Sequence, residues 1–412
     1  MRPSDHGGAT KSAPKRPNMT SFADRIANIR PEGAYQVLAQ AQELERQGRD
    51  IIHLEIGQPD FQTFEPICDS GRRAITEGHT RYTPSAGIRE LREAIAEHIS
   101  ATKGPCAPSE VVVGPGAKPG IVFPILALVN PGDEVLYPDP GFPSYRADIE
   151  LAGGIPVAAP LLEQRNFSFD LDFLADHMGD KTKLLILNSP SNPTGGTIPR
   201  EDLETIAQLA IERDVWVMTD EIYGDLVYDD QTAPSFWSIA AARHRTILVD
   251  GFSKSFAMTG WRLGYAAMPK ALAEKVALLT MHAVGCTAGF TQVAGVTALE
   301  QCRAAVNAQR AIYQARRDRI VGGLNSLPGV SCVKPSGAFY AFPNVTGLGI
   351  PSVELARRLL NEAGVACLSG TDFGEHGEGY LRFSYAASLE AIEEAVDRIR
   401  GFIAKRPVSS SA

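Results

Sequence analysis

The feature that most constrains the fold of this chain is a regular alternation between residue 85 and about residue 270. Short, almost wholly apolar runs are typical of strands buried on both faces of a parallel sheet. Between them lie segments such as residues 87–100, whose apolar side chains recur at the three- and four-residue spacing of a helix. Strand and helix in alternation predict an α/β domain with a mostly parallel, doubly wound sheet. The predicted strands cover residues 111–113, 134–137, 183–187, 215–218, 246–249 and 263–267.

The two ends of the chain show a different pattern. One helix is predicted over residues 30–48, and a long basic helix over 301–327. Short strands are then expected near 331–342, 365–368 and 380–384, with helices between them. We therefore expect a smaller α+β domain built from both chain ends. The predicted division is a disordered tail over residues 1–20, a smaller domain over 21–55 and 301–405, and a large domain over 56–300.

Composition excludes several classes of protein. The 412 residues are 44% hydrophobic and 21% charged, which is the balance of a soluble globular protein. A net charge of −8 argues against nucleic-acid binding, and no apolar run is long enough to span a membrane. No secretory signal follows the basic residues near the start, so we expect a cytoplasmic protein. The six cysteines are dispersed without C-x-x-C spacing, which predicts free thiols and no metal site.

Ligands of open α/β sheets bind beyond the carboxyl ends of the strands. After the first predicted strand come Gly114, Gly116, Ala117 and Lys118, followed by an apolar helix. Glycines and a helix start favour a bound phosphate. The segment 114–120 also nearly matches the dinucleotide fingerprint G-x-G-x-x-G, with its third glycine one residue late.

Three further strand ends carry polar side chains. Asn192 follows in a polar turn, and Asp220 ends a strand, where a carboxylate either caps a helix or holds a protonated ring nitrogen. Lys254 lies in a stretch without acids, and burial makes a lysine nucleophilic toward carbonyls. Arg262 offers a planar fork for a phosphate or carboxylate. A phosphate cradle, an amide, an acid, a lysine and an arginine are together what pyridoxal phosphate (PLP) requires.

Three segments carry a family resemblance: 191–195 (SNPTG), 220–223 (DEIY) and 253–265 (SKSFAMTGWRLGY). In order and spacing they resemble the class I/II aminotransferases of PLP fold type I, and the similarity extends from about residue 25 to 400. The resemblance implies a PLP-dependent enzyme that moves amino groups between amino acids and 2-oxo acids. It also implies a homodimer with shared active sites.

The resemblance assigns roles around the cofactor ring. Lys254 is similar to the lysine that carries the cofactor as a Schiff base and then shuttles the substrate proton. Asp220 is similar to the partner of the ring nitrogen. Tyr223 and Asn192 match donors to the ring oxygen, and Phe142 falls where the family stacks an aromatic side chain on the ring.

Further assignments concern the phosphate and the substrate. Arg382 matches the clamp on the substrate carboxylate, with Gly57 and Asn192 beside it. Many relatives have a serine three residues before the lysine, where this chain has Gly251, so Ser253 is the nearest hydroxyl. Tyr82 matches a tyrosine that reaches the phosphate of the neighbouring subunit. The remaining expected phosphate ligands are Gly116, Ala117, Lys118 and Arg262.

The sequence leaves alternatives open for both the substrate and the reaction type. Ping-pong transfer is expected, and Lys118 favours aspartate- or glutamate-type substrates, although hydroxyl residues are absent around Glu32. Alanine-, aromatic- and branched-chain-type substrates stay open. One alternative is another PLP enzyme, either a β-elimination lyase or a cyclopropane-forming synthase. A second is a nicotinamide oxidoreductase that uses residues 114–120. A third is a serine acyl enzyme that uses the S-x-x-K match at Ser100 and Lys103. A ligand sensor fused to a DNA reader is disfavoured by the short tail.

Overall fold

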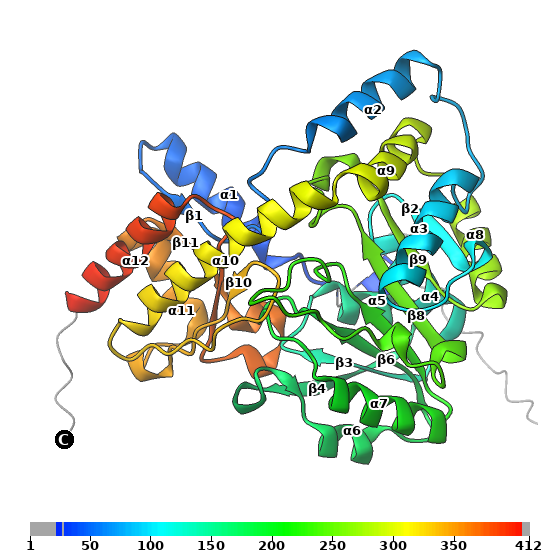
Figure 1. The fold of residues 1–412 in the computed structure, drawn as a ribbon. Coiled ribbons are helices and arrows are strands. Elements are labelled where there is room, and N and C mark those ends of the chain that lie inside the picture. Colours follow the sequence, from blue (N-terminus) through cyan, green and yellow to red (C-terminus); the bar gives the residue numbers. More distant parts are fainter. Residues whose placement is uncertain (1–21, 27–28, 406–412) are drawn as a thin grey trace, which may run out of the picture.

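A computed structural model describes residues 22–26 and 29–405, so the tail predicted at 1–20 lies outside the described residues. Its centre is an eight-stranded sheet with the order β2-β9-β8-β7-β6-β3-β4-β5 (Figure 1). Pairs among β8, β7, β6, β3 and β4 are parallel. The predicted α/β fold with a mostly parallel sheet is confirmed. The strands are β2 (Val111–Gly114), β3 (Glu134–Asp139), β4 (Ile155–Leu162), β5 (Ser168–Phe169), β6 (Thr182–Asn188), β7 (Trp216–Asp220), β8 (Thr246–Gly251) and β9 (Gly264–Ala267).

The continuous apolar runs arise because the sheet is buried on both faces. In β6, Leu184 and Ile186 belong to one hydrophobic cluster, while Leu185 and Leu187 belong to another. Successive side chains of a strand point to opposite faces, so each face of β6 supplies a separate core. The covering helices are α4 (Lys118–Leu128), α5 (Ser144–Ala152) and α8 (Lys270–Ala283) on the first face, and α6 (Leu171–His177) and α7 (Arg200–Glu212) on the second.

The sheet differs from the expectation at two places. Strand β4 was not predicted, because it contains Pro156 and Pro160 and is only partly buried, which hides it among turn-like residues. Its neighbour β5 has only two residues and pairs with it antiparallel. Strand β9 is antiparallel to both β2 and β8, so it enters the sheet from the edge at which its neighbours end.

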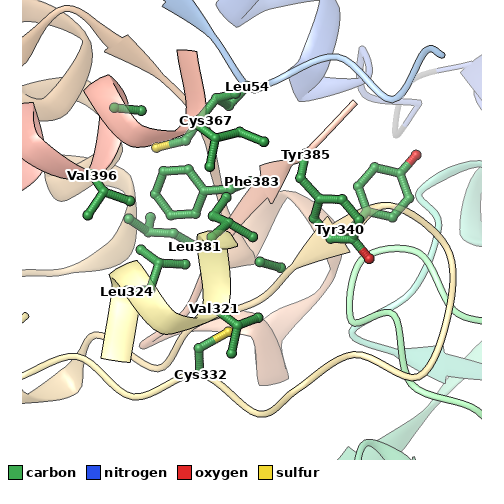
Figure 2. Packing of buried hydrophobic residues seen from close by; sticks show 14 of the residues in the cluster. Leu54, Val321, Leu324, Cys332, Tyr340, Cys367, Leu381, Phe383, Tyr385 and Val396 are labelled. Carbon is green, nitrogen blue, oxygen red and sulfur yellow. The ribbon is translucent and has the colours of Figure 1, made fainter. Parts of the chain in front are cut away.

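Both ends of the chain contribute to a second, smaller assembly. Strand β1 (Ile52–His53) pairs with β11 (Val365–Ala366), and β13 (Leu381–Ser384) lies between β10 (Tyr340–Ala341) and β12 (Leu368–Ser369). Figure 2 shows Leu54 close to Cys367 within the shared core. The exact domain bounds given above stay a prediction. The helices here are α1 (Gly33–Arg46), α10 (Arg303–Asn325), α11 (Ser352–Arg358) and α12 (Leu389–Ala404).

Three more helices complete the large assembly: α2 (Glu65–Thr76), α3 (Arg89–Thr102) and α9 (Gly289–Gln301). In Figure 1 helix α10 runs from the large assembly to the smaller one. All six cysteines lie in the described part of the chain and are free thiols. Within residues 22–26 and 29–405, no helix is both long and apolar enough to cross a membrane.

Candidate active site

One edge of the central sheet gathers most of the predicted site residues. Strands β3, β6, β7 and β8 are parallel and end there, and β2 ends there too because it is antiparallel to β9. Gly264, the first residue of β9, pairs with the last residues of both β2 and β8. Arg262, just before β9, is therefore brought to the same edge as Asp220 at the end of β7.

Lys254 lies in the turn after β8, where its side chain enters the site. Its Nζ donates a hydrogen bond of 2.6 Å to the Gly57 carbonyl and lies 5.7 Å from the ring centre of Phe339. Burial, with the positive charges of Arg382 and Arg262, lowers the pKa of Lys254 to about 8. An amine with this pKa is partly neutral near physiological pH, as nucleophilic attack on a carbonyl requires.

Asp220, the last residue of β7, is 4% exposed. Its Oδ2 accepts a 2.8 Å hydrogen bond from the Tyr145 hydroxyl, and its Oδ1 accepts one of 3.2 Å from the Ile222 amide. Burial raises the pKa of Asp220 to about 6, although both donors oppose this effect. The carboxylate is thus mostly ionised at neutral pH and can hold a protonated nitrogen.

Tyr223 reaches across to the smaller assembly. Its hydroxyl and that of Tyr340 are 2.7 Å apart, and both side chains are buried. Burial raises the pKa of Tyr223 well above its ordinary value, so the hydroxyl keeps its proton. A phenol that keeps its proton can donate to a ring oxygen. A Cβ at Gly57 would fall 2.1 Å from the Tyr340 hydroxyl, so only glycine fits there.

Arg382 on β13 joins the smaller assembly to the sheet edge. The residue is 3% exposed, and its guanidinium donates a 3.1 Å hydrogen bond to the Asn192 side-chain oxygen and another to the Glu55 carbonyl. Asn192 is held in place because its backbone N–H donates a 2.8 Å hydrogen bond to the side-chain oxygen of Asn188 at the end of β6. Within the described residues, the buried Nε of Arg382 has no hydrogen-bond partner. A buried donor without a partner is costly, and a carboxylate ligand would satisfy it.

The turn after β2 forms a close-fitting cradle with the start of β9. Gly116 has φ +90°, and a Cβ there would lie 2.4 Å from the Arg262 guanidinium. A Cβ at Gly264 would lie 2.5 Å from the Ala117 nitrogen. Helix α4 begins at Lys118, so its first backbone N–H groups and its positive dipole end face this turn. The arrangement suits a phosphate group.

Close packing explains why position 251 is a glycine. A Cβ there would lie 3.0 Å from the Cα of Gly264 and 3.2 Å from Ile222. A serine side chain at Gly251 would therefore crowd β9. Ser253, two residues further along the chain, is buried.

Phe142 and Lys118 occupy the outer part of the site. The ring of Phe142 packs edge-on against Tyr145 at 5.6 Å between centres, and the Lys118 Nζ lies 5.3 Å from its centre. Lys118 forms an ion pair with Glu32, which immediately precedes α1. The residue expected to bind a phosphate or a second carboxylate thus has a carboxylate partner within the chain.

Tyr82 is the predicted site residue that the single chain does not bring to the sheet edge. Its side chain is 96% exposed, and among the described residues no hydrogen bond or ring contact joins it to Lys254 or Arg262. Its neighbour Thr83 is anchored through a hydrogen bond from its backbone amide to Cys286. Tyr82 is thus an exposed side chain next to an anchored residue.

Sequence reasoning assigned no role to Tyr145 or Tyr340. Tyr145 stands three residues after Phe142, and this short separation was the available signal. Tyr340 gave no signal because its contact with Tyr223 spans 117 residues of sequence.

The S-x-x-K match has a structural role. The Lys103 Nζ lies 2.9 Å from Glu221 and 3.0 Å from Asp250. Against the effect of burial, these two carboxylates raise the pKa of Lys103. Ser100 accepts a 3.0 Å hydrogen bond from the Cys106 amide and donates to its carbonyl. Serine and lysine are thus engaged with different partners, which argues against an acyl enzyme.

These observations fit PLP. Lys254 supplies an amine of lowered pKa, and Asp220 supplies a buried carboxylate for the ring nitrogen. The cradle of Gly116 and Gly264 leaves no room for side chains beside Arg262, and the unpartnered Nε of Arg382 suits the substrate carboxylate.

Comparisons with known proteins agree with this geometry. The family model described as "Aminotransferase class I and II" matches residues 49–399. The chain is 39% identical to an aspartate aminotransferase of Pyrococcus horikoshii over 92% of its own length and 96% of that protein. It is 39% identical to aromatic-amino-acid aminotransferase 2 of Thermococcus litoralis, with 92% and 97% covered. The solved structure of the Thermus thermophilus aspartate aminotransferase with maleate superposes with a TM-score of 0.89 at 38% identity, covering 93% of this chain and 100% of that one.

Proposed function

Because the chain belongs to the class I and II aminotransferase family, which uses PLP, we propose that it moves amino groups between an L-amino acid and a 2-oxo acid with the cofactor on Lys254. The enzyme is a transaminase. The observation that carries the cofactor assignment is the convergence of Lys254, Asp220 and Arg382, three residues on separate elements. Their amine, carboxylate and guanidinium meet at one sheet edge.

The chemistry that PLP supplies when bound is that of an aldehyde that condenses with amines and of a ring that withdraws electrons. With the cofactor bound, Lys254 would take the substrate's α-proton and return it two bonds away, on the far side of the amino nitrogen, acting as base and then as acid. Asp220 keeps a proton on the ring nitrogen. Arg382 holds the substrate carboxylate through two parallel hydrogen bonds, which fixes the orientation of the reacting carbon. Two half-reactions through one site give ping-pong kinetics.

For the substrate we favour amino acids of the aspartate and glutamate type. Lys118 supports this choice, since its ammonium lies beside Phe142 at the outer end of the site. Relatives named for aspartate and for aromatic amino acids match this chain equally well, at 39% identity. A homodimer in the cytoplasm completes the proposal, with the exposed Tyr82 supporting a shared site.

The test is direct. The purified protein is mixed with PLP, and its absorbance is followed while single amino acids and then single 2-oxo acids are added. We expect a yellow protein whose colour borohydride discharges, amino transfer to an added 2-oxo acid, and no turnover for Lys254→Ala. The matched control is Lys270→Ala, on the exposed start of α8.

An active Lys254→Ala variant would overturn the assignment of the lysine. Release of ammonia and pyruvate in place of amino transfer would identify a β-elimination lyase.

A further inference from the structure

The ion pair between Lys118 and Glu32 places a carboxylate of the chain itself at the outer end of the site. The same Glu32 oxygen accepts a 3.3 Å hydrogen bond from the Ser144 hydroxyl at the start of α5. Three elements thus converge here: the residue before α1, the start of α4 and the start of α5.

The environment of Lys118 is acidic beyond this one partner. Asp148 on α5 lies within electrostatic reach: burial raises the pKa of its carboxyl to about 7, Lys118 opposes the rise and Glu32 adds to it. The negative charge of Glu32 also acts on Lys254, where it favours the protonated amine. Glu32 therefore lies within electrostatic range of both Lys118 and Lys254.

An aminotransferase passes two different substrates through one site. If one substrate carries a second carboxylate and the other does not, an isolated Lys118 beside the Phe142 ring would be left without a counter-ion in one half of the cycle. Lys118 is half-exposed, so water covers part of its charge and the cost of leaving it unpaired is modest. Glu32 supplies that partner from within the chain.

We propose that Glu32 determines substrate specificity by standing in for the second carboxylate of a dicarboxylic substrate. When the bound amino acid has an uncharged side chain, Glu32 stays paired with Lys118. When the substrate is a dicarboxylate, its second carboxylate replaces Glu32 at the Lys118 ammonium, and the Glu32 side chain moves outward. The proposal rests on the aminotransferase function proposed above, and it lets one site accept both substrate classes.

The local structure allows this exchange at low cost. The side chains of Lys118 and Glu32 are 51% and 26% exposed, and exposed ion pairs are weak. The backbone packs closely at the next residue, since a Cβ at Gly33 would lie 2.6 Å from the Asp372 carboxylate. Movement of the Glu32 side chain alone would free the Lys118 ammonium.

The experiment uses the PLP-loaded enzyme and measures binding through the cofactor absorbance. Maleate serves as the inert dicarboxylate, and 3-phenylpropionate as the inert monocarboxylate. We expect Glu32→Gln to tighten maleate binding about fivefold, the effect of removing one competing exposed ion pair. Binding of 3-phenylpropionate should change less than about twofold by the same reasoning. The matched control is Glu43→Gln on α1, whose carboxylate pairs with Arg46.

A second pair of variants isolates the interaction. In a Lys118→Met background, Glu32→Gln should leave maleate affinity unchanged, because the competition requires the ammonium. A fully loaded enzyme whose maleate affinity is unchanged or weakened by Glu32→Gln would overturn the role of Glu32 alone. A protein that takes up no PLP would overturn the proposed function, and this proposal with it.

Discussion

The Tyr145 hydroxyl donates a 2.8 Å hydrogen bond to Oδ2 of Asp220, and the two side chains are buried between α5 and β7. The bond links a helix residue to the strand end at which the carboxylate sits. With the Ile222 amide on Oδ1, each oxygen of Asp220 has a donor. Burial raises the pKa of Asp220 to about 6 and these donors restrain the rise, so the carboxylate stays available as an anion at neutral pH.

Replacing Tyr145 by phenylalanine tests this link. Loss of the donor should raise the pKa of Asp220, and turnover at pH 7 should fall about tenfold, the usual effect of a lost hydrogen bond to a charged group. The acid limb of the pH profile should move to higher pH. Tyr380→Phe, which loses a 2.7 Å bond to Glu163 away from the site, is the control. A pH profile identical to that of the parent would refute the link.

Asp220→Asn should make the cofactor-free protein more stable while abolishing most turnover. The folded-state pKa of Asp220, about 6, lies above its ordinary value of 3.8, so the folded protein binds more protons between these pH values. Its stability therefore falls as pH rises from 4 to 6. The uncharged amide escapes this loss, and the gain should reach at most about 3 kcal/mol by pH 7.

Calorimetric melting of both proteins between pH 4 and pH 7.5 measures this gain. A difference in melting temperature that did not widen with pH would contradict the expectation.

Cofactor uptake should follow the titration of Lys254. With its pKa lowered to about 8, the neutral fraction is about a tenth at pH 7 and rises through pH 8. The rate of colour development with PLP should rise over the same range. Because the Arg382 charge contributes to the lowered pKa, Arg382→Gln should move the midpoint to higher pH.

The control for this titration is Arg358→Gln, whose guanidinium pairs with Glu362 at the surface. A midpoint near the ordinary lysine pKa in the parent enzyme would show that the amine is not perturbed.

Gly251→Ser should destabilise the enzyme by about 1–3 kcal/mol, because an added side chain would overpack the contact with Gly264. The hydroxyl that many relatives carry at this position should therefore fail to strengthen PLP binding here. Gly401→Ser on α12, where an added Cβ meets nothing within 4 Å, should leave stability nearly unchanged. Urea unfolding and a PLP titration check both parts, and tighter PLP binding without loss of stability would disprove the packing argument.

The sequence by itself determined the fold class and the placement of the main site residues. Buried strands such as β6 are short apolar runs that can be recognised locally. Asp220 ends a strand, and Asn192 and Lys254 lie in the turns after two others. In an α/β sheet this local position is enough to bring them to one edge. Strand β4 was not predicted, because its two prolines are typical of a turn.

The tertiary structure decided which side chains touch. Tyr145 meets Asp220 across 75 residues, Tyr223 meets Tyr340 across 117, and Lys118 meets Glu32 across 86. No local pattern encodes such pairs, because each depends on how helices and strands pack against one another. The same packing explains the glycine at position 251, because the nearby backbone of β9 leaves little room for a side chain there. Charge, burial and hydrogen bonding at the site arise from these long-range contacts, so the lowered pKa of Lys254 and the partner of Lys118 emerge only once the chain is folded.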